Sequence, residues 1–256
     1  MADLSGKTVV VTGASKGIGA ATAAAMLAAG ARVVAHYGAD RAGAEAAVAG
    51  AAPGQAHLIA ADFSDLAAVD AFWQQAVAAL GRVDVLVNNA AIMRQSGGIE
   101  DALDVWDAVW DETLTVNVHA AARVMRHAVR GWLAAGTGGC LIGIGSWVET
   151  RGTSNPGAIA YAASKAAIAA ATRTVARNYA ARGILAHVIA PGVVRTRMSV
   201  ETAERTVGEA AVTAGLPMGE WVPPEEIAAL AVFLASGQAR HLTGATLDIN
   251  GAAYIR

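Results

Sequence analysis

Short runs of consecutive apolar residues alternate along this chain with longer stretches rich in alanine. The apolar residues of each run are continuous, as in strands that are buried on both faces, and do not alternate with polar ones. Strands that alternate with helices are joined by right-handed crossovers and build a parallel sheet covered on both sides. We therefore predict a doubly wound α/β fold with about seven strands. The predicted strands cover residues 8–11, 32–36, 57–60, 83–87, 140–144, 185–189 and 246–249, and the predicted helices 17–29, 41–49, 66–80, 101–135 with a break, 160–181, 200–213 and 224–235.

One stretch departs from this tight alternation. Between residues 192 and 223, a helical middle is interrupted by Gly208, Gly215, Pro217 and Gly219. Long irregular connections in compact domains often cover a binding site, and ligands of such sheets bind beyond the carboxyl ends of the strands. We predict a single domain over residues 1–256 in which residues 192–222 form a lid. A plain surface insertion is the alternative.

Composition excludes several classes of function. Apolar residues make up 55% of the chain, and the net charge of −2 gives no reason to expect nucleic acid. No apolar stretch approaches the ~20 residues of a membrane span, and the first residues do not resemble a secretory leader. Cys140 lies in an apolar run, and the six histidines show no metal-ligand spacing. We expect a cytoplasmic protein that binds no metal, no membrane and no nucleic acid.

A glycine-rich loop directly follows the first predicted strand and opens the first predicted helix. Its sequence, from Thr12 to Gly19, is Thr-Gly-Ala-Ser-Lys-Gly-Ile-Gly. Glycines permit a tight turn there and let a phosphate approach the backbone, while the helix N-terminus offers free N–H donors. Such a loop is weak evidence alone, but its place between strand and helix indicates a dinucleotide site.

Tyr161 and Lys165 are four residues apart on a predicted helix and therefore share one face of it. A free phenol titrates near pH ~10, and a neighbouring ammonium lowers that pKa toward the working range of an acid–base catalyst. Ser146 ends an apolar run fifteen residues upstream and could hold a reacting oxygen. An exposed tyrosine beside a solvated lysine is the alternative. The chain has only three lysines against sixteen arginines, so a lysine at this place by chance is less expected.

Six motifs together resemble the short-chain dehydrogenase/reductase family, and in particular its short, single-domain branch of 3-oxoacyl-ACP reductase-like members. They run in the family's order from residue 8 to residue 251. The motifs are Thr12–Gly19, Asn88-Asn89-Ala90, Asn117, Ser146, Tyr161 with Lys165, and Pro191-Gly192. The resemblance implies a Rossmann-type sheet and an NAD(P)-dependent enzyme.

The resemblance also implies roles for four catalytic residues. Tyr161 would be the general acid that protonates a carbonyl oxygen, or the base in the reverse direction. Lys165 would lower its pKa and bind the nicotinamide ribose, Ser146 would hold the substrate oxygen, and Asn117 would anchor a water in a proton relay. Asn117 has a helix irregularity as its alternative role.

By the same resemblance, further residues would bind the cofactor together with Tyr161 and Lys165. They are Gly13, Ser15, Lys16, Gly17, Ile18, Gly19, Tyr37, Asp62, Phe63, Asn89, Ala90, Pro191, Gly192, Val194 and Thr196. Asp62 and Ser64 compete as caps of the helix that begins near residue 66.

Charge at the end of the second strand separates the two nicotinamide cofactors. An acid there binds the ribose 2′-hydroxyl and repels a 2′-phosphate, but this chain has Tyr37 at that place. Lys16 and Arg41 could pair with a 2′-phosphate. We therefore expect NADP(H) in preference to NAD(H), although a small loop shift could bring Asp40 to the ribose.

The loop between Ser146 and Tyr161 is longer than the family's commonest spacing of about thirteen residues. It should form one wall of the substrate site, which we predict to be lined by Met93, Trp147, Arg151, Met198 and Trp221. A buried Trp147 and a solvated Arg151 are the alternatives. Ala91 also departs from the family, which usually has a glycine there.

These observations favour an oxidoreductase that moves a hydride between NADP(H) and a small carbonyl or secondary alcohol. A dinucleotide sensor or scaffold on the same fold is the alternative, and a lyase or epimerase is a more distant one. Relatives are commonly tetramers or dimers, so we expect a homotetramer.

Overall fold

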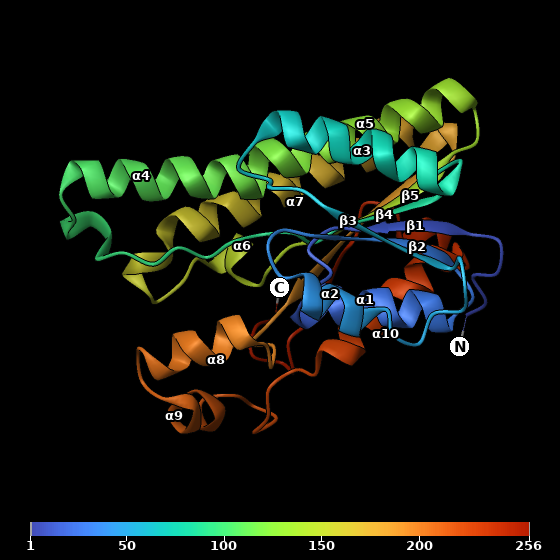
Figure 1. Ribbon diagram of the computed structural model, residues 1–256. Helices are drawn as coiled ribbons and strands as arrows, with labels where there is room; N and C mark the ends of the chain where they lie inside the picture. Colours follow the sequence, from blue (N-terminus) through green and yellow to red (C-terminus); the bar gives the residue numbers. More distant parts are fainter. Residues whose placement is uncertain (1, 256) are drawn as a thin grey trace.

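Seven parallel strands form one sheet in the computed structural model, which describes residues 2–255 (Figure 1). Their order across the sheet is β3-β2-β1-β4-β5-β6-β7. The predicted Rossmann-type, doubly wound sheet is therefore confirmed. The strands are β1 (Thr8–Val11), β2 (Arg32–Tyr37), β3 (Ala56–Ala60), β4 (Val85–Asn88), β5 (Gly139–Ile144), β6 (Ile184–Pro191) and β7 (Thr246–Ile249).

The winding reverses at β1, which lies between β2 and β4. Val10 of β1 is in register with Val34 on one side and with Leu86 on the other. Two crossovers that leave the sheet in opposite directions open a crevice beyond the carboxyl ends of these strands. The fold therefore places the loops that follow β1 and β4 side by side.

Helices cover both faces of the sheet, with α1, α2 and α10 on one side and α3, α5 and α7 on the other (Figure 1). Alternate residues of β1 serve the two sides: Val9 and Val11 pack with Met26 of α1, and Val10 packs with Phe72 of α3. The helices are α1 (Gly17–Ala28), α2 (Arg41–Ala47), α3 (Leu66–Leu80), α4 (Leu103–Leu114), α5 (Ala121–Ala135), α6 (Val148–Arg151), α7 (Ile159–Tyr179), α8 (Arg197–Glu204), α9 (Glu209–Ala214) and α10 (Pro224–Ser236).

Two predicted helices differ from the structure. The break within residues 101–135 is a π-helical segment, Thr115–Ala120, which joins α4 to α5 without a loop. The helix predicted over 200–213 is two helices, α8 and α9, because the chain turns at Gly208 with a φ of 86°. A short helix that was not predicted, α6, lies just after β5.

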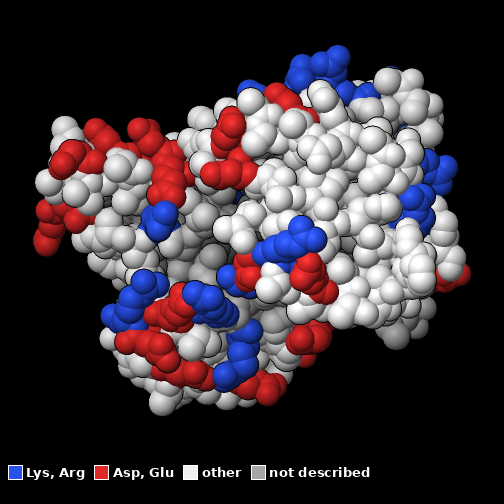
Figure 2. Space-filling view, viewed as in Figure 1, with Lys and Arg blue, Asp and Glu red and all other residues white. Residues whose placement is uncertain are grey.

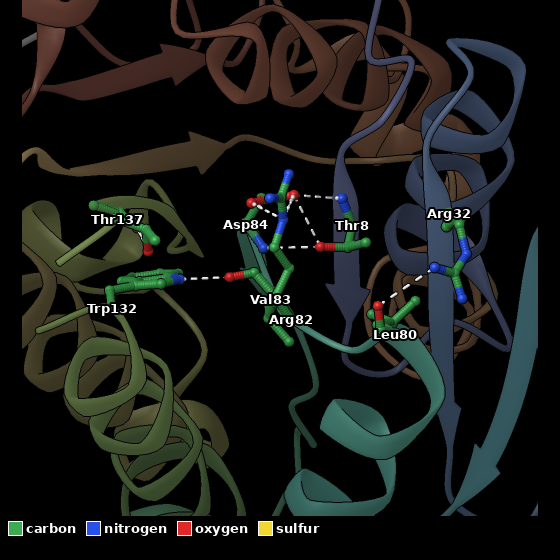
Figure 3. A network of polar contacts seen from close by, with 9 residues as sticks. Thr8, Arg32, Leu80, Arg82, Val83, Asp84, Trp132 and Thr137 are labelled. Atoms are coloured by element: carbon green, nitrogen blue, oxygen red, sulfur yellow. Dashed lines mark hydrogen bonds and ion pairs between the residues drawn. The ribbon is translucent and has the colours of Figure 1, made fainter. Parts of the chain in front are cut away.

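The opposite edge of the sheet, at the amino ends of the strands, is held by Asp84 (Figure 3). Its carboxylate accepts hydrogen bonds from the Thr8 amide and hydroxyl, both at 2.9 Å, and pairs with Arg82 at 3.0 Å. The Trp132 indole donates to the Val83 carbonyl at 2.6 Å. The Asp84 bonds join the start of β1 to the residue before β4, at the end of the sheet away from the crevice.

Among residues 2–255, no helix is both long and apolar enough to cross a bilayer. The same residues contain no cluster of histidine, cysteine and acidic side chains suited to a metal ion.

Candidate active site

A cavity of about 400 Å³ lies beyond the carboxyl ends of β1, β4, β5 and β6. Figure 2 shows the surface hollowed on this side, between the projecting α4 and the segment that carries α8 and α9. The cavity is lined by Gly13, Ser15, Lys16, Gly17, Ile18, Asn89, Ala90, Ala91, Ile144, Gly145, Ser146, Tyr161, Lys165, Pro191, Gly192, Val194, Thr196, Arg197, Met198, Ser199 and Glu201.

The glycine-rich loop has the shape that a dinucleotide phosphate requires. Gly13 and Gly17 have φ angles of 68° and 52°, which favour glycine. A Cβ on Gly17 would come within 2.8 Å of the Thr196 side chain, so the loop and the β6 segment leave room only for backbone. No side chain caps the N-terminus of α1, and its free N–H groups suit an anion. The residues present therefore fit a dinucleotide cofactor.

Asn89 ties this loop to the end of β4. Its side-chain amide donates to the Thr12 carbonyl at 2.8 Å and to the Gly13 carbonyl at 3.1 Å. The Thr12 hydroxyl in turn accepts from the amides of Asn89 and Ala90, at 2.9 and 3.0 Å. Asn89 thus holds the backbone of the glycine-rich loop through hydrogen bonds and also lines the cavity.

Asn117 lies in the π-helical segment, and its side chain faces the protein interior. Its carbonyl accepts from the Ile92 amide at 2.8 Å, and its amide donates to the Ile92 carbonyl at 2.8 Å and to the Ser164 hydroxyl at 3.0 Å. That hydroxyl donates to the Tyr161 carbonyl at 2.7 Å. Asn117 therefore connects the loop after β4 to the helix that carries Tyr161, without itself lining the cavity.

Tyr161, Lys165 and Ser146 meet in the cavity, as the sequence predicts. Lys165 donates to the Ile144 carbonyl at 2.8 Å, and its Nζ is 5.6 Å from the centre of the Tyr161 ring. Burial raises the pKa of Tyr161 to about 12, against a hydrogen bond with Ser146 that lowers it. Burial is therefore the largest influence on the phenol in the free protein, and the lowering of its pKa by Lys165 stays a prediction.

Burial also lowers the pKa of Lys165, to about 8, while the negative charge of Glu149 opposes this shift. An ammonium that titrates near neutrality can lose or keep its proton in the working range of an enzyme. The tyrosine and lysine therefore lie together in the cavity, and burial disfavours the charged form of each.

Asp40, which could approach the ribose, already has two interaction partners in this structure. Its carboxylate pairs with Lys16 at 2.8 Å and caps α2 by accepting from the Gly43 amide at 3.0 Å. These two interactions hold the pKa of Asp40 below its ordinary value, Lys16 contributing most. Tyr37 is buried at the end of β2, and Arg41 pairs with Glu45 at 2.8 Å.

Asp62 and Phe63, two of the residues predicted to bind the cofactor, lie in different surroundings. Asp62 is exposed to the surface and accepts from the Ser64 amide at 2.8 Å, and the cap of α3 is Asp65, not Asp62 or Ser64. The Phe63 ring is buried and stacks on His36 with 4.0 Å between ring centres. The prediction that Phe63 contacts the cofactor therefore fails for its side chain, which belongs to the core.

Of the five predicted substrate-lining residues, only Met198 lines the cavity. Trp221 is 3% exposed and donates to the Thr213 hydroxyl at 2.7 Å, beside a separate hollow next to Arg195. Its prediction is therefore wrong, because the turn before α10 carries the ring away from the crevice. Trp147 and Arg151 stack on each other, 4.6 Å apart, at the edge of the loop. Met93 and these two lie outside the cavity lining.

Sequence reasoning missed the charged residues of α8 that line the cavity, Arg197 and Glu201, which pair at 2.6 Å. Their spacing of four in a helix is the signal that could have found the pair. It also missed His36 and Glu149, whose burial follows from tertiary packing.

Comparisons with known proteins identify the family of this chain. A family model described as "Enoyl-(Acyl carrier protein) reductase" matches residues 13–252. The 3beta-hydroxysteroid dehydrogenase 1 of Eggerthella lenta is 40% identical over 99% of this chain and 95% of its own length. The chain belongs to the short-chain dehydrogenase/reductase family and is an NAD(P)-dependent oxidoreductase of it.

Two solved structures share the fold closely. A short-chain dehydrogenase from Burkholderia cenocepacia in complex with NADP is 33% identical, covers 98% of both chains and superposes with a TM-score of 0.85. The 3-ketoacyl-(acyl-carrier-protein) reductase from Brucella melitensis, complexed with NADH, is 29% identical with a TM-score of 0.86, and the match covers 99% of this chain and all of that one.

Proposed function

We propose that this protein interconverts a small carbonyl compound and the corresponding secondary alcohol, with NADP(H) as its cofactor. The observation that carries the proposal is the meeting of Tyr161, Lys165 and Ser146 in the same cavity as the glycine-rich loop. The cofactor, when bound, supplies or accepts the hydride. A binding protein without chemistry would have no use for a phenol that lines the cavity beside a buried ammonium.

In the proposed reaction, the Tyr161 hydroxyl gives its proton to the carbonyl oxygen during reduction and takes it back during oxidation. Ser146 lies beside Tyr161 and offers a second hydrogen bond to the same oxygen. Lys165 stabilises the phenolate that remains, because its ammonium is held in the same low-dielectric site. Asn117 keeps the helix of Tyr161 in register with the loop after β4 through Ser164.

Replacing Tyr161 by Phe tests this function. The variant should bind NADPH as the wild type does and lose turnover by about 10²- to 10⁴-fold, as expected for removal of a general acid. Tyr179→Phe is the matched control, since Tyr179 lies on the same helix against the core and should keep its activity. Turnover that survives in Tyr161→Phe would sink the mechanism and favour the dinucleotide sensor instead.

The choice of NADP(H) is supported by the charges at the ribose end. Lys16 lines the cavity, and no acid stands where Tyr37 ends β2. Loss of one hydrogen bond to a charged group costs about 1.5–3 kcal/mol, or roughly tenfold or more in binding. Lys16→Ala should therefore narrow the preference for NADPH over NADH by about tenfold. Asp40→Asn should widen it, because it frees Lys16.

Steady-state rates with the two cofactors measure this preference directly. A clear preference for NADH in the wild type would overturn the cofactor proposal. A screen of NADPH oxidation across ketones, keto sugars, quinones and β-ketoacyl thioesters should identify the carbonyl class.

We further infer that residues 192–222 act as the lid of this site. Met198 of α8 lines the cavity, and the Gln95 side chain, from the loop after β4, donates to the Thr202 hydroxyl of α8 at 3.2 Å. That hydrogen bond joins the lid to the opposite rim of the cavity.

We also propose a cytoplasmic homotetramer of single-domain subunits. The exposed side chains of Ile99, before α4, and Leu103, its first residue, support the assembly. Light scattering that shows a monomer at working concentration would refute the assembly.

A further inference from the structure

A buried carboxylate lies directly behind the proposed catalytic serine. Glu149 is on α6, three residues after Ser146, and its side chain is 1% exposed. Its Oε2 accepts a hydrogen bond from the Ser146 amide at 3.3 Å. Acidic side chains are rarely this buried unless they are paired, because removing the charge from water is costly. The burial of the Glu149 carboxylate therefore indicates a role other than packing.

Arg173 of α7 supplies the paired charge. Its Nη1 is 3.4 Å from Glu149 Oε1 and donates to the Thr246 hydroxyl of β7 at 3.1 Å. The Arg173 side chain is 43% exposed, so the guanidinium closes the carboxylate off from the solvent side. Arg173 is on the same helix as Tyr161 and Lys165. Glu149 thereby links the turn that carries Ser146 to the helix that carries the other two residues.

The backbone leaves space for this carboxylate. A Cβ on Gly145 would collide with Glu149 Oε2 and come within 2.9 Å of the Val188 side chain. Only glycine before Ser146 therefore permits Glu149 to fold back under the turn. Ser146 Oγ also accepts from the Val148 amide at 3.4 Å, which adds a second local bond to the same turn.

Glu149 and Lys165 contact the same short stretch of backbone: Lys165 donates to the Ile144 carbonyl at 2.8 Å, and Glu149 accepts from the Ser146 amide at 3.3 Å. Burial lowers the pKa of Lys165 to about 8, and Glu149 is the group that opposes this shift. Two further titratable groups described near the pair are Tyr161, one turn from Lys165, and Arg173, and the Ile144 carbonyl of β5 accepts from the ammonium. Glu149 is thus the acidic group that acts on the lysine among the contacts that the structure describes.

We propose that Glu149 is a positioning residue of the active site: its carboxylate, held by Arg173, fixes the turn of Ser146 beside the Lys165 ammonium. The catalytic meaning of this role rests on the proposed function. The interaction with Lys165 does not, so the two can be tested separately.

Glu149→Gln is the decisive variant, because it keeps the shape and an acceptor for the Ser146 amide and removes only the charge. The chain has three lysines, Lys7, Lys16 and Lys165, so NMR of the protein labelled with ¹³C at lysine Cε gives few signals to assign. Loss of the opposite charge should lower the pKa of Lys165 by about one unit. An unchanged titration of Lys165 in Glu149→Gln would overturn the proposal, whether or not the protein proves to be an enzyme.

Kinetics give the second measurement. If the pKa of Lys165 falls from about 8 to about 7, the charged fraction at pH 8 falls about fivefold, whereas near pH 6 it hardly changes. The kcat of Glu149→Gln should therefore fall about fivefold at pH 8 and little at pH 6. A merely structural role would reduce kcat equally at both pH values, and that result would overturn the proposal.

Arg173→Ala should weaken kcat in the same direction, because the carboxylate loses its anchor. Arg177→Ala is the matched control: Arg177 is exposed one turn further along α7, and its loss should leave kcat unchanged. An Arg173→Ala variant that behaves as Arg177→Ala would remove Arg173 from the proposal.

Discussion

The buried imidazole of His36 makes the stability of this protein sensitive to acid. His36 is 3% exposed at the end of β2. Its Nδ1 accepts from the Gly13 amide at 3.0 Å, so the ring proton is on Nε2, which lies 3.0 Å from the Ala61 carbonyl. Both nitrogens are satisfied only in the neutral ring, since a protonated Nδ1 has no lone pair for Gly13. Burial lowers the pKa of His36 to about 4.

The size of the effect follows from linkage. A histidine whose pKa is depressed in the folded state contributes full stability above its unfolded pKa of about 6.5 and loses it as the pH falls toward 4. With these two values, the free energy of unfolding should fall by about 2 kcal/mol between pH 7.5 and pH 5 on account of His36 alone. Within the folded protein, the Gly13 hydrogen bond should be lost only at lower pH, near 4, where His36 itself becomes protonated.

The perturbation is His36→Gln, which removes the titrating group and leaves an acceptor near Gly13. Urea unfolding of both proteins at pH 7.5 and pH 5 gives four free energies, and the difference of differences isolates His36 from other buried groups such as His187. The variant should lose about 2 kcal/mol less than the wild type between the two pH values. Equal losses in both proteins would refute the reasoning.

Two further predictions follow from the two edges of the sheet. Asp84→Ala removes the acceptor for both Thr8 hydrogen bonds and should lower the free energy of unfolding by about 2 kcal/mol. The affinity for NADPH, measured by fluorescence, should not change. A changed affinity would contradict the view that the amino end of the sheet acts independently of the cofactor site at the carboxyl end. Gly19→Ala places a Cβ against the Gly13 carbonyl and within 2.5 Å of the Asn89 side-chain amide. Neither group moves easily, because one is backbone and the other is held by hydrogen bonds. NADPH binding by this variant should weaken by about tenfold or more, and unchanged binding would show that the loop yields easily.

Local sequence patterns predict most of the secondary structure. All seven strands lie at or within two residues of their predicted ends, because each is a continuous apolar run between turn residues. The segment 192–222 was predicted to contain one helix and contains two, because the conformation of Gly208 depends on how the segment packs, which no local pattern specifies. The loop before Tyr161 likewise gained α6, a single turn too short for periodicity to reveal.

For the site, the sequence by itself determined the glycine-rich loop and the shared face of Tyr161 and Lys165, because both depend on spacings of a few residues within one element. Only the tertiary structure decided that Phe63 turns into the core and Trp221 away from the crevice, and that Glu149 is buried behind the serine. These outcomes depend on contacts between residues far apart in the chain. Hydrophobic burial and charge pairing select such contacts only when the layers of the fold come together.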